Sequence, residues 1–292
     1  MQKKIVQFLF LILLILPALA FASGHGHHRT DKKGILLVAF GSSIPQAQVS
    51  FDNIDKSVKA TFKDVPVYWA YTSDIIRNKL AKQGKVLDSV AMALAKMADQ
   101  GFTQVAVQSL HTIRGEEYDD LVKTAEAFEG MPNGIKRIVV GNPLISSQED
   151  IEDVALAIVS NIPRERKPQE AVILMGHGTP HHSNAFYAAL MFNLQKIDPN
   201  IFVGTVEGSP EIGDIKEMLK KKGLKSAYLI PFMSVAGDHA RNDMSGDDDD
   251  SWKSILTKAG IECRVVLKGT AEYDNMVAIW IKHLGQAMEH LK

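Results

Sequence analysis

Two histidines in the second half of the sequence each follow an apolar run and have glycine nearby. One run leads into Gly176-His177-Gly178, and the other leads into Gly237-Asp238-His239. Such runs are typical of buried parallel strands, and open α/β sheets bind ligands outside the carboxyl ends of their strands. Imidazole is the commonest metal ligand and also exchanges protons near neutral pH. The pair therefore indicates a metal site or acid–base chemistry, whereas either histidine alone could simply close a turn.

The two halves of the sequence resemble each other, and this similarity adds a carboxylate to the pair of histidines as a candidate site residue. Phe40-Gly41-Ser42 stands where Gly176-His177-Gly178 stands, and Gly115-Glu116-Glu117 stands where Gly237-Asp238-His239 stands. If two similar domains face each other, Glu117, His177 and His239 surround one cleft.

Two imidazoles and a carboxylate suit divalent cobalt, iron, nickel or zinc. The three residues are far apart in the sequence, so they do not form a local zinc motif such as His-Glu-x-x-His. The pattern favours a transient site that hands its metal over, because closed structural sites normally use four ligands. A hydrolase is disfavoured, because the sequence contains neither a Gly-x-Ser-x-Gly elbow nor a phosphate-binding loop.

Strand and helix patterns alternate along most of the chain, without hairpin signals. We expect strands at 65–71, 103–109, 137–141, 171–175, 201–205 and 261–267, and two more that begin at residues 34 and 226. We expect helices at 46–62, 74–83, 86–100, 116–128, 149–160, 183–197, 211–222, 251–259 and from 272 onward. This alternation predicts an α/β fold of two similar domains, each a parallel sheet flanked by helices, with the active cleft between them.

The expected domain order follows from composition. An N-terminal α/β domain at 34–165 and a C-terminal α/β domain at 166–270 are separated near the linker-like segment 163–168, and a final helix at 271–292 packs back on the body. The periodicity of that helix places His283 and His290 off its apolar face, so both are expected in solvent.

The first 22 residues have the pattern of a secretory signal peptide. Lys3 and Lys4 precede a short apolar stretch, and Ala20 and Ala22 stand where a signal peptidase reads small residues. An uncleaved anchor is the less favoured alternative, and periplasmic export is expected in a Gram-negative source. The leader at 23–33 contains three histidines, which could bind a divalent ion or have no essential role.

Composition excludes some functions. The chain has 292 residues and a formal net charge of −1, so nothing suggests a nucleic-acid partner. Cys263 is the only cysteine, which rules out an intrachain disulfide although export is expected. Its strand-like surroundings favour a buried small hydrophobic residue rather than a reactive thiol.

A set of motifs gives a specific resemblance from about residue 34 to the last helix. These are Gln108-Ser-Leu-His111, Gly115-Glu-Glu-Tyr118, Met175-Gly-His-Gly178 with His181-His182, Val235-Ala-Gly-Asp-His-Ala240, Asn242-Asp-Met244 and Asp248-Asp-Asp-Ser-Trp252. Together they resemble the anaerobic sirohydrochlorin cobaltochelatases, which are CbiK-type class II chelatases related to bacterial ferrochelatase. The signal peptide is similar to the periplasmic version of sulfate-reducing bacteria.

The resemblance implies insertion of Co²⁺ or Fe²⁺ into sirohydrochlorin by a metal chelatase that needs no organic cofactor. It implies that His177 and His239 are the catalytic metal-binding histidines and that Glu117 is the active-site acid. Insertion releases two pyrrole N–H protons, and imidazole, with a pKa near ~6.5, is a suitable base at neutral pH.

Further residues follow from what the resemblance implies about the substrate. Sirohydrochlorin carries many carboxylates, so Arg114 and Arg241 are expected substrate-binding residues, although each could instead form a structural ion pair. The acidic run 247–250 either attracts divalent ions or caps the following helix. The resemblance is compatible with a homo-oligomer and with haem binding. His111, His181 and His182 are available as haem ligands, and none of them is assigned.

Two alternatives to catalysis remain open at this point. The chain could be an exported carrier of a tetrapyrrole, haem or metal that kept a chelatase fold and lost turnover. It could also store metal through the His-rich leader. The presence of Glu117, His177 and His239 together favours catalysis, because a carrier does not need a proton acceptor at each position.

Overall fold

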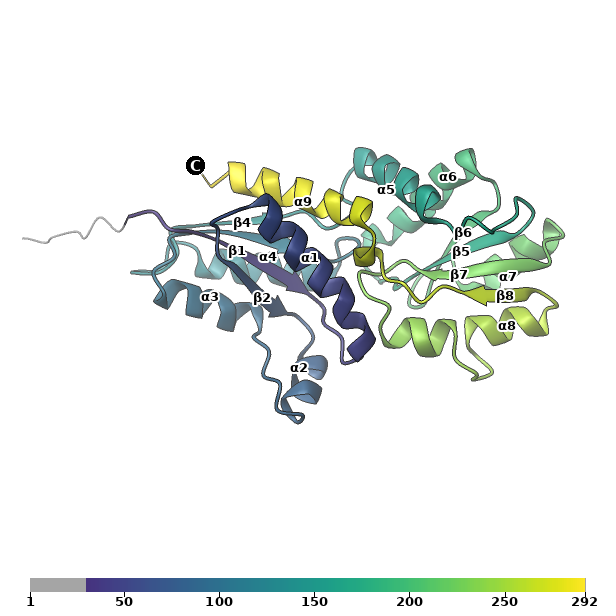
Figure 1. The fold of residues 1–292 in the computed structure, drawn as a ribbon, viewed down its shortest axis with the longest axis horizontal. Helices are drawn as coiled ribbons and strands as arrows, with labels where there is room; N and C mark the ends of the chain where they lie inside the picture. The colour runs from purple at the N-terminus through teal and green to yellow at the C-terminus, as the bar shows by residue number, and fades with distance from the viewer. Residues whose placement is uncertain (1–29, 292) are drawn as a thin grey trace, which may run out of the picture. The chain divides into compact units, whose positions relative to one another are not determined.

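The computed structural model describes residues 30–291 (Figure 1). The predicted signal peptide and the histidines at 23–28 lie outside the described residues. The predicted boundary at 165/166 falls in the connection between helix α5 (Gln148–Asn161) and strand β5 (Ala171–Gly176). The division into two domains stays a prediction.

The first sheet has four parallel strands in the order β2-β1-β3-β4. Its strands are β1 (Lys33–Ala39), β2 (Val67–Tyr71), β3 (Gln104–Ser109) and β4 (Arg137–Gly141). Its connecting helices are α1 (Gln48–Thr61), α2 (Asp74–Ala81), α3 (Val90–Asp99) and α4 (Glu116–Phe128). Leu37 in β1 pairs with Trp69 of β2 on one side and with Gln108 of β3 on the other.

The second sheet repeats this topology in the order β6-β5-β7-β8, again with parallel strands. After β5 come β6 (Ile201–Thr205), β7 (Ser226–Pro231) and β8 (Glu262–Val265). The helices of this half are α6 (Ala185–Ile197), α7 (Ile212–Lys221), α8 (Trp252–Lys258) and, after β8, α9 (Asp274–Glu289). The shared strand order confirms the predicted fold class of two similar parallel sheets flanked by helices.

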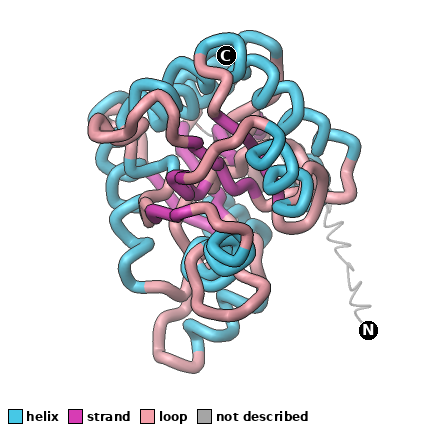
Figure 2. Tube along the Cα trace, turned by 90° about the vertical axis from the view of Figure 1, so that its right-hand side faces the viewer, coloured by secondary structure: helices cyan, strands magenta, loops and turns pink. Residues whose placement is uncertain are grey.

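Alternate residues of each strand pack into different hydrophobic layers, as the two-residue period of a strand requires. Ile35 and Leu37 belong to a core that continues into the second sheet through Val172 and Leu174 and is covered by α1, α5, α6 and α9. The opposite face of the first sheet packs on α3 and α4, and that of the second on α7 and α8. Figure 2 shows the strands enclosed by these helices. Because both faces are covered, the strands read as continuous apolar runs.

Serine side chains set the first residues of several helices. Ser73, Ser89, Ser147 and Ser251 each accept a hydrogen bond from a backbone amide in the first turn of the following helix. The cap at Ser89 explains why α3 begins at Val90 rather than at the predicted residue 86. The residue after His239 starts a π-helix, Ala240–Met244, which the sequence analysis did not predict.

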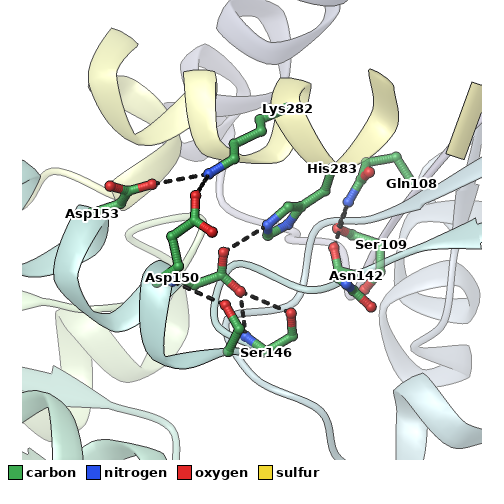
Figure 3. Close-up of polar contacts among 10 residues, drawn as sticks. Gln108, Ser109, Asn142, Ser146, Asp150, Asp153, Lys282 and His283 are labelled. Atoms are coloured by element: carbon green, nitrogen blue, oxygen red, sulfur yellow. Dashed lines mark hydrogen bonds and ion pairs between the residues drawn. The ribbon is translucent and has the colours of Figure 1, made fainter. Parts of the chain in front are cut away.

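The prediction that His283 lies in solvent is wrong, whereas His290 is exposed as expected. The His283 side chain is 3% exposed and its Nε2 lies 3.0 Å from Asp150 Oδ1 on α5 (Figure 3). Helix α9 packs on β3 and β4 of the first sheet between α1 and α5, so a polar side chain beside its apolar stripe is covered as well. A hydrophobic period alone could not show that α5 supplies a carboxylate there.

Candidate functional site

The strand order places the carboxyl ends of β1 and β3 next to each other in the first sheet, and those of β5 and β7 in the second. Helices α1 and α4, which follow β1 and β3, cover opposite faces of the first sheet. Helices α6 and α8 divide in the same way in the second. Ligands of open α/β sheets bind at this point, where the connections diverge. His177 follows β5 directly, and Glu117 lies in the first turn of α4, the helix that follows β3.

Loops from the carboxyl ends of the two sheets are in contact. The Ser183 hydroxyl donates a hydrogen bond to the backbone carbonyl of Arg114. A β-carbon on Gly237 would lie 3.5 Å from Ser42 Oγ, and one on Gly115 would lie 3.7 Å from Thr179 Oγ1. The loops after β1 and β3 therefore meet the loops after β5 and β7, as the predicted internal repeat requires.

The imidazoles of His177 and His239 are neighbours. Their ring centroids are 4.7 Å apart with an angle of 86° between the ring planes. The two side chains are 42% and 34% exposed, so solutes can reach them. A metal–imidazole bond of about 2.1 Å places a ring centroid about 3.2 Å from the ion, so this spacing corresponds to an angle of roughly 95° at an ion bound by both rings. The spacing is suitable for two ligands of one divalent ion.

Each of these histidines has a partner at Nδ1. His177 Nδ1 lies 3.0 Å from the carbonyl oxygen of Gly178 and 3.8 Å from Glu207 Oε2. His239 Nδ1 lies 2.5 Å from Asp243 Oδ2, four residues further along the chain. Asp243 belongs to the motif Asn242-Asp-Met244, for which the sequence alone indicates no function. The spacing of four residues after His239 is the signal that could have singled it out.

Glu117 is held by side chains from the first sheet. The Thr72 hydroxyl, just after β2, donates to Glu117 Oε2 at 2.6 Å, and His111 Nε2 lies 3.1 Å from the same oxygen. Burial raises the pKa of the Glu117 carboxyl, but these hydrogen bonds and the charges of His111 and His177 outweigh it, so the pKa is below its ordinary value. The charge of His177 contributes to this lowering, so Glu117 lies within electrostatic reach of His177.

Within residues 30–291, no three histidine, cysteine, aspartate or glutamate side chains gather closely enough to hold a metal ion. The structure therefore brings His177 and His239 together and places Glu117 nearby, without a preformed site of three ligands.

Comparison with known proteins identifies the family. The family model described as cobalt chelatase (CbiK) matches residues 33–289, which include every strand and helix of both sheets. The chain belongs to the cobalt chelatase family.

Two curated relatives of this cobalt chelatase cover nearly all of its sequence. It is 44% identical over 265 residues to the sirohydrochlorin cobaltochelatase CbiKC of Nitratidesulfovibrio vulgaris, an alignment that spans 91% of this chain and 94% of the relative. It is 36% identical over 261 residues to the sirohydrochlorin cobaltochelatase of Salmonella typhimurium, spanning 88% and 97%. Among solved structures, SirB from Bacillus subtilis with Fe³⁺ is similar with a TM-score of 0.58 at 16% identity, covering 88% of this chain and 95% of SirB. This last similarity supports the fold alone.

The two arginines predicted to bind substrate in this cobalt chelatase have different surroundings. Arg114 Nε donates to Asp119 Oδ1 at 2.6 Å, and its side chain is 55% exposed. Arg241 lies in the π-helix and is half-buried, and its buried Nε has no hydrogen-bond partner among the described residues. Arg114 thus forms the ion pair that the sequence analysis weighed as its alternative, and Arg241 has no ion-pair partner among residues 30–291.

The other histidines considered as haem ligands lie on the same loops. His111 Nδ1 is 2.8 Å from Ser109 Oγ, so both ring nitrogens of His111 have partners. His181 Nδ1 is 2.9 Å from Ser183 Oγ, and its Nε2 is 3.7 Å from Asp119 Oδ2. His182 is exposed, with its ring centroid 3.9 Å from that of His181. A haem ligand stays a prediction without an assigned residue.

The acidic run at 247–250 is a solvated turn. Asp247 and Asp249 are 97% and 95% exposed and pair with Lys253 and Lys258 of α8. Ser251, not an aspartate, accepts the capping hydrogen bond of α8. These ion pairs connect the acidic run to α8, the helix that follows it.

Proposed function

We propose that this chain inserts Co²⁺ into sirohydrochlorin, as its two curated relatives are named for doing. The observation that carries the proposal is the adjacent pair His177 and His239, with Glu117 in electrostatic reach of His177, where the loops after the strands of the two sheets meet. Accessible imidazoles can accept the metal, and the contacting loops are where a macrocycle would be bound.

The residues present match what the reaction needs. Insertion of a divalent ion displaces two protons from pyrrole nitrogens, so the site must hold the ion loosely and accept protons beside it. The His177 and His239 imidazoles can do both, because the hydrogen bonds and ion pairs that each makes with the described residues involve Nδ1 and leave Nε2 available. Glu117 has an acidic carboxyl whose lowered pKa keeps it ionised at neutral pH, so it is available to attract the ion or take a proton. Holding the macrocycle against these three side chains orients it for the reaction.

The proposal includes Fe²⁺ as a second metal substrate, because two imidazoles and a carboxylate accept both ions. It includes no organic cofactor, since metal insertion transfers no electrons or groups. Arg241 is the better of the two expected contacts for the substrate carboxylates, because its guanidinium has no ion-pair partner in the described chain. The product belongs to cobalamin or related tetrapyrrole biosynthesis.

The location of the protein is part of the proposal. The N-terminal pattern at 1–22 supports export to the periplasm with removal of that segment. None of the helices within residues 30–291 is both long enough and apolar enough to cross a bilayer. Measuring the mass of the N-terminus and the compartment of the protein in its native host tests the export proposal. Retention of residues 1–22 contradicts cleavage.

The test of function is direct. Purified protein is mixed with sirohydrochlorin and Co²⁺, and the change in the absorbance spectrum of the macrocycle is followed against the same mixture without protein. Saturable acceleration that depends on both substrates supports a chelatase. Tight binding of sirohydrochlorin with insertion no faster than the uncatalysed rate would instead identify the carrier alternative. Repeating the assay with Fe²⁺ tests the second metal.

A further inference from the structure

We propose that Asp243 is a positioning residue that fixes His239 so that its Nε2 faces the incoming metal, and that both histidines bind the metal through Nε2. The inference rests on the proposed function and deepens it, because it assigns the binding nitrogens and an additional residue of the site. The comparisons and the sequence motifs assign no role to Asp243.

The hydrogen-bond partners determine which nitrogen carries the proton in each ring. The Gly178 carbonyl oxygen can only accept a hydrogen bond, so His177 Nδ1, 3.0 Å away, must be the donor. An ionised Asp243 carboxylate also only accepts, so His239 Nδ1 donates to it across 2.5 Å. A neutral imidazole with its proton on Nδ1 has its free lone pair on Nε2. Both rings therefore present Nε2 to a metal.

The local backbone explains why Asp243 reaches His239. The π-helix Ala240–Met244 starts directly after His239, and its wide turn is an arrangement that often occurs at functional sites. Ala240 and Met244 are fully buried, and the Ser245 hydroxyl donates to the carbonyl oxygens of Ala240 and Arg241. The turn is thus anchored on both sides of Asp243, and the carboxylate is held within hydrogen-bonding distance of His239 Nδ1.

The two histidines differ in the partner that holds them. His239 has a carboxylate in hydrogen-bonding contact, whereas the carboxylate near His177, that of Glu207, is 3.8 Å away and a neutral carbonyl makes the contact instead. A carboxylate on the far nitrogen of a metal-binding histidine orients the ring and makes it a stronger ligand, and its loss typically weakens metal binding by about 10–100-fold. Asp243 should therefore act on the metal and not on the macrocycle.

The test compares Asp243→Ala, Asp243→Asn and wild type, with Asp247→Asn as control. Asp247 is another carboxylate of the same loop, 97% exposed and paired only with Lys253 in the described chain. The first readout is the Kd for Co²⁺ alone, from the visible absorbance of the protein-bound ion. The second is the KM for Co²⁺ and the KM for sirohydrochlorin in the insertion assay, and thermal unfolding reports the fold.

Asp243→Ala is expected to raise the Kd and the KM for Co²⁺ by about 10–100-fold and to leave the KM for sirohydrochlorin near that of wild type. Asp243→Asn is expected to lose less, because the amide oxygen can still accept from Nδ1, and this variant serves if Asp243→Ala does not fold. Unchanged Co²⁺ binding in both variants, or an equal loss in Asp247→Asn, overturns the proposal. Co²⁺ binding that needs Asp243 in a protein without insertion activity supports the positioning role and refutes the proposed function.

Discussion

Asp150 on α5 and His283 on α9 form a buried pair that joins two helices 133 residues apart in the sequence. The carboxylate also accepts hydrogen bonds from the backbone amide and the hydroxyl of Ser146, at 2.9 and 2.8 Å (Figure 3). Burial raises the pKa of the Asp150 carboxyl, but the bonds from His283 and Ser146 outweigh it and hold the pKa well below the ordinary value. The C-terminal helix is therefore attached to α5 by a charged group inside the protein.

Replacing Asp150 with Asn should lower the free energy of unfolding by about 3 kcal/mol at pH 7, the usual cost of removing one partner of a buried pair. The folded-state pKa lies below the unfolded value near ~3.9, so the carboxylate stabilises the fold above that pH and the stabilisation is lost as pH falls further. The difference between wild type and Asp150→Asn should then narrow below about pH 4. Urea unfolding at several pH values measures it.

Asp153→Asn is the matched control for that experiment. Asp153 is on the same helix, is 43% exposed and lies 3.3 Å from Lys282 on α9. A surface ion pair contributes about 0–1 kcal/mol, so this variant should unfold close to wild type at every pH. Equal losses in the two variants would contradict a special role for the buried pair.

His177→Ala and His239→Ala should each reduce Co²⁺ insertion by at least about 10²-fold, as expected when a group that binds the metal and takes a proton is removed. Both side chains are partly exposed, so the melting temperature should stay close to that of wild type. Initial rates and thermal unfolding are measured on the same preparations. A variant that loses its fold together with its activity would show that the histidine is structural.

The sequence predicted the histidine pair because each histidine lies in the connection after a strand with a continuous apolar run, His177 directly after β5 and His239 in the loop after β7, and strand ends meet at one edge of a parallel sheet. It predicted α4, β4 and β6 to the residue. It could not predict contacts made by polar side chains, because these do not belong to the hydrophobic periodicity from which helices and strands are predicted. Thr72, just after β2, reaches Glu117 on α4, and Asp150 on α5 reaches His283 on α9. The π-helix that holds Asp243 was missed because five residues are too few for a helical pattern.

Cys263 should react slowly with thiol reagents in the folded protein. It lies half-buried in β8, and burial raises its pKa to about 11. Only the thiolate reacts, so at pH 8 the native thiol should be labelled at least about 100-fold more slowly than the same thiol in urea. A colourimetric disulfide reagent measures both rates. Rapid labelling of the native protein would show that the strand is open to solvent and that a thiolate is available to bind metal.

In a plot of insertion rate against pH, the rate falls at acidic pH as Glu117 is protonated. Thr72→Val should shift this acid limb to higher pH. The Thr72 hydroxyl donates to Glu117 Oε2 and is one of the groups that keep the Glu117 pKa low, so its loss raises that pKa. The ionised carboxylate is then lost at a higher pH as the solution is acidified, while the rate recovers toward that of wild type at high pH. Thr124→Val, on the exposed side of α4, should leave the profile unchanged, and Glu117→Gln should remove the limb. A rate that falls equally at every pH in Thr72→Val would mean that the hydroxyl places Glu117 rather than keeping it ionised.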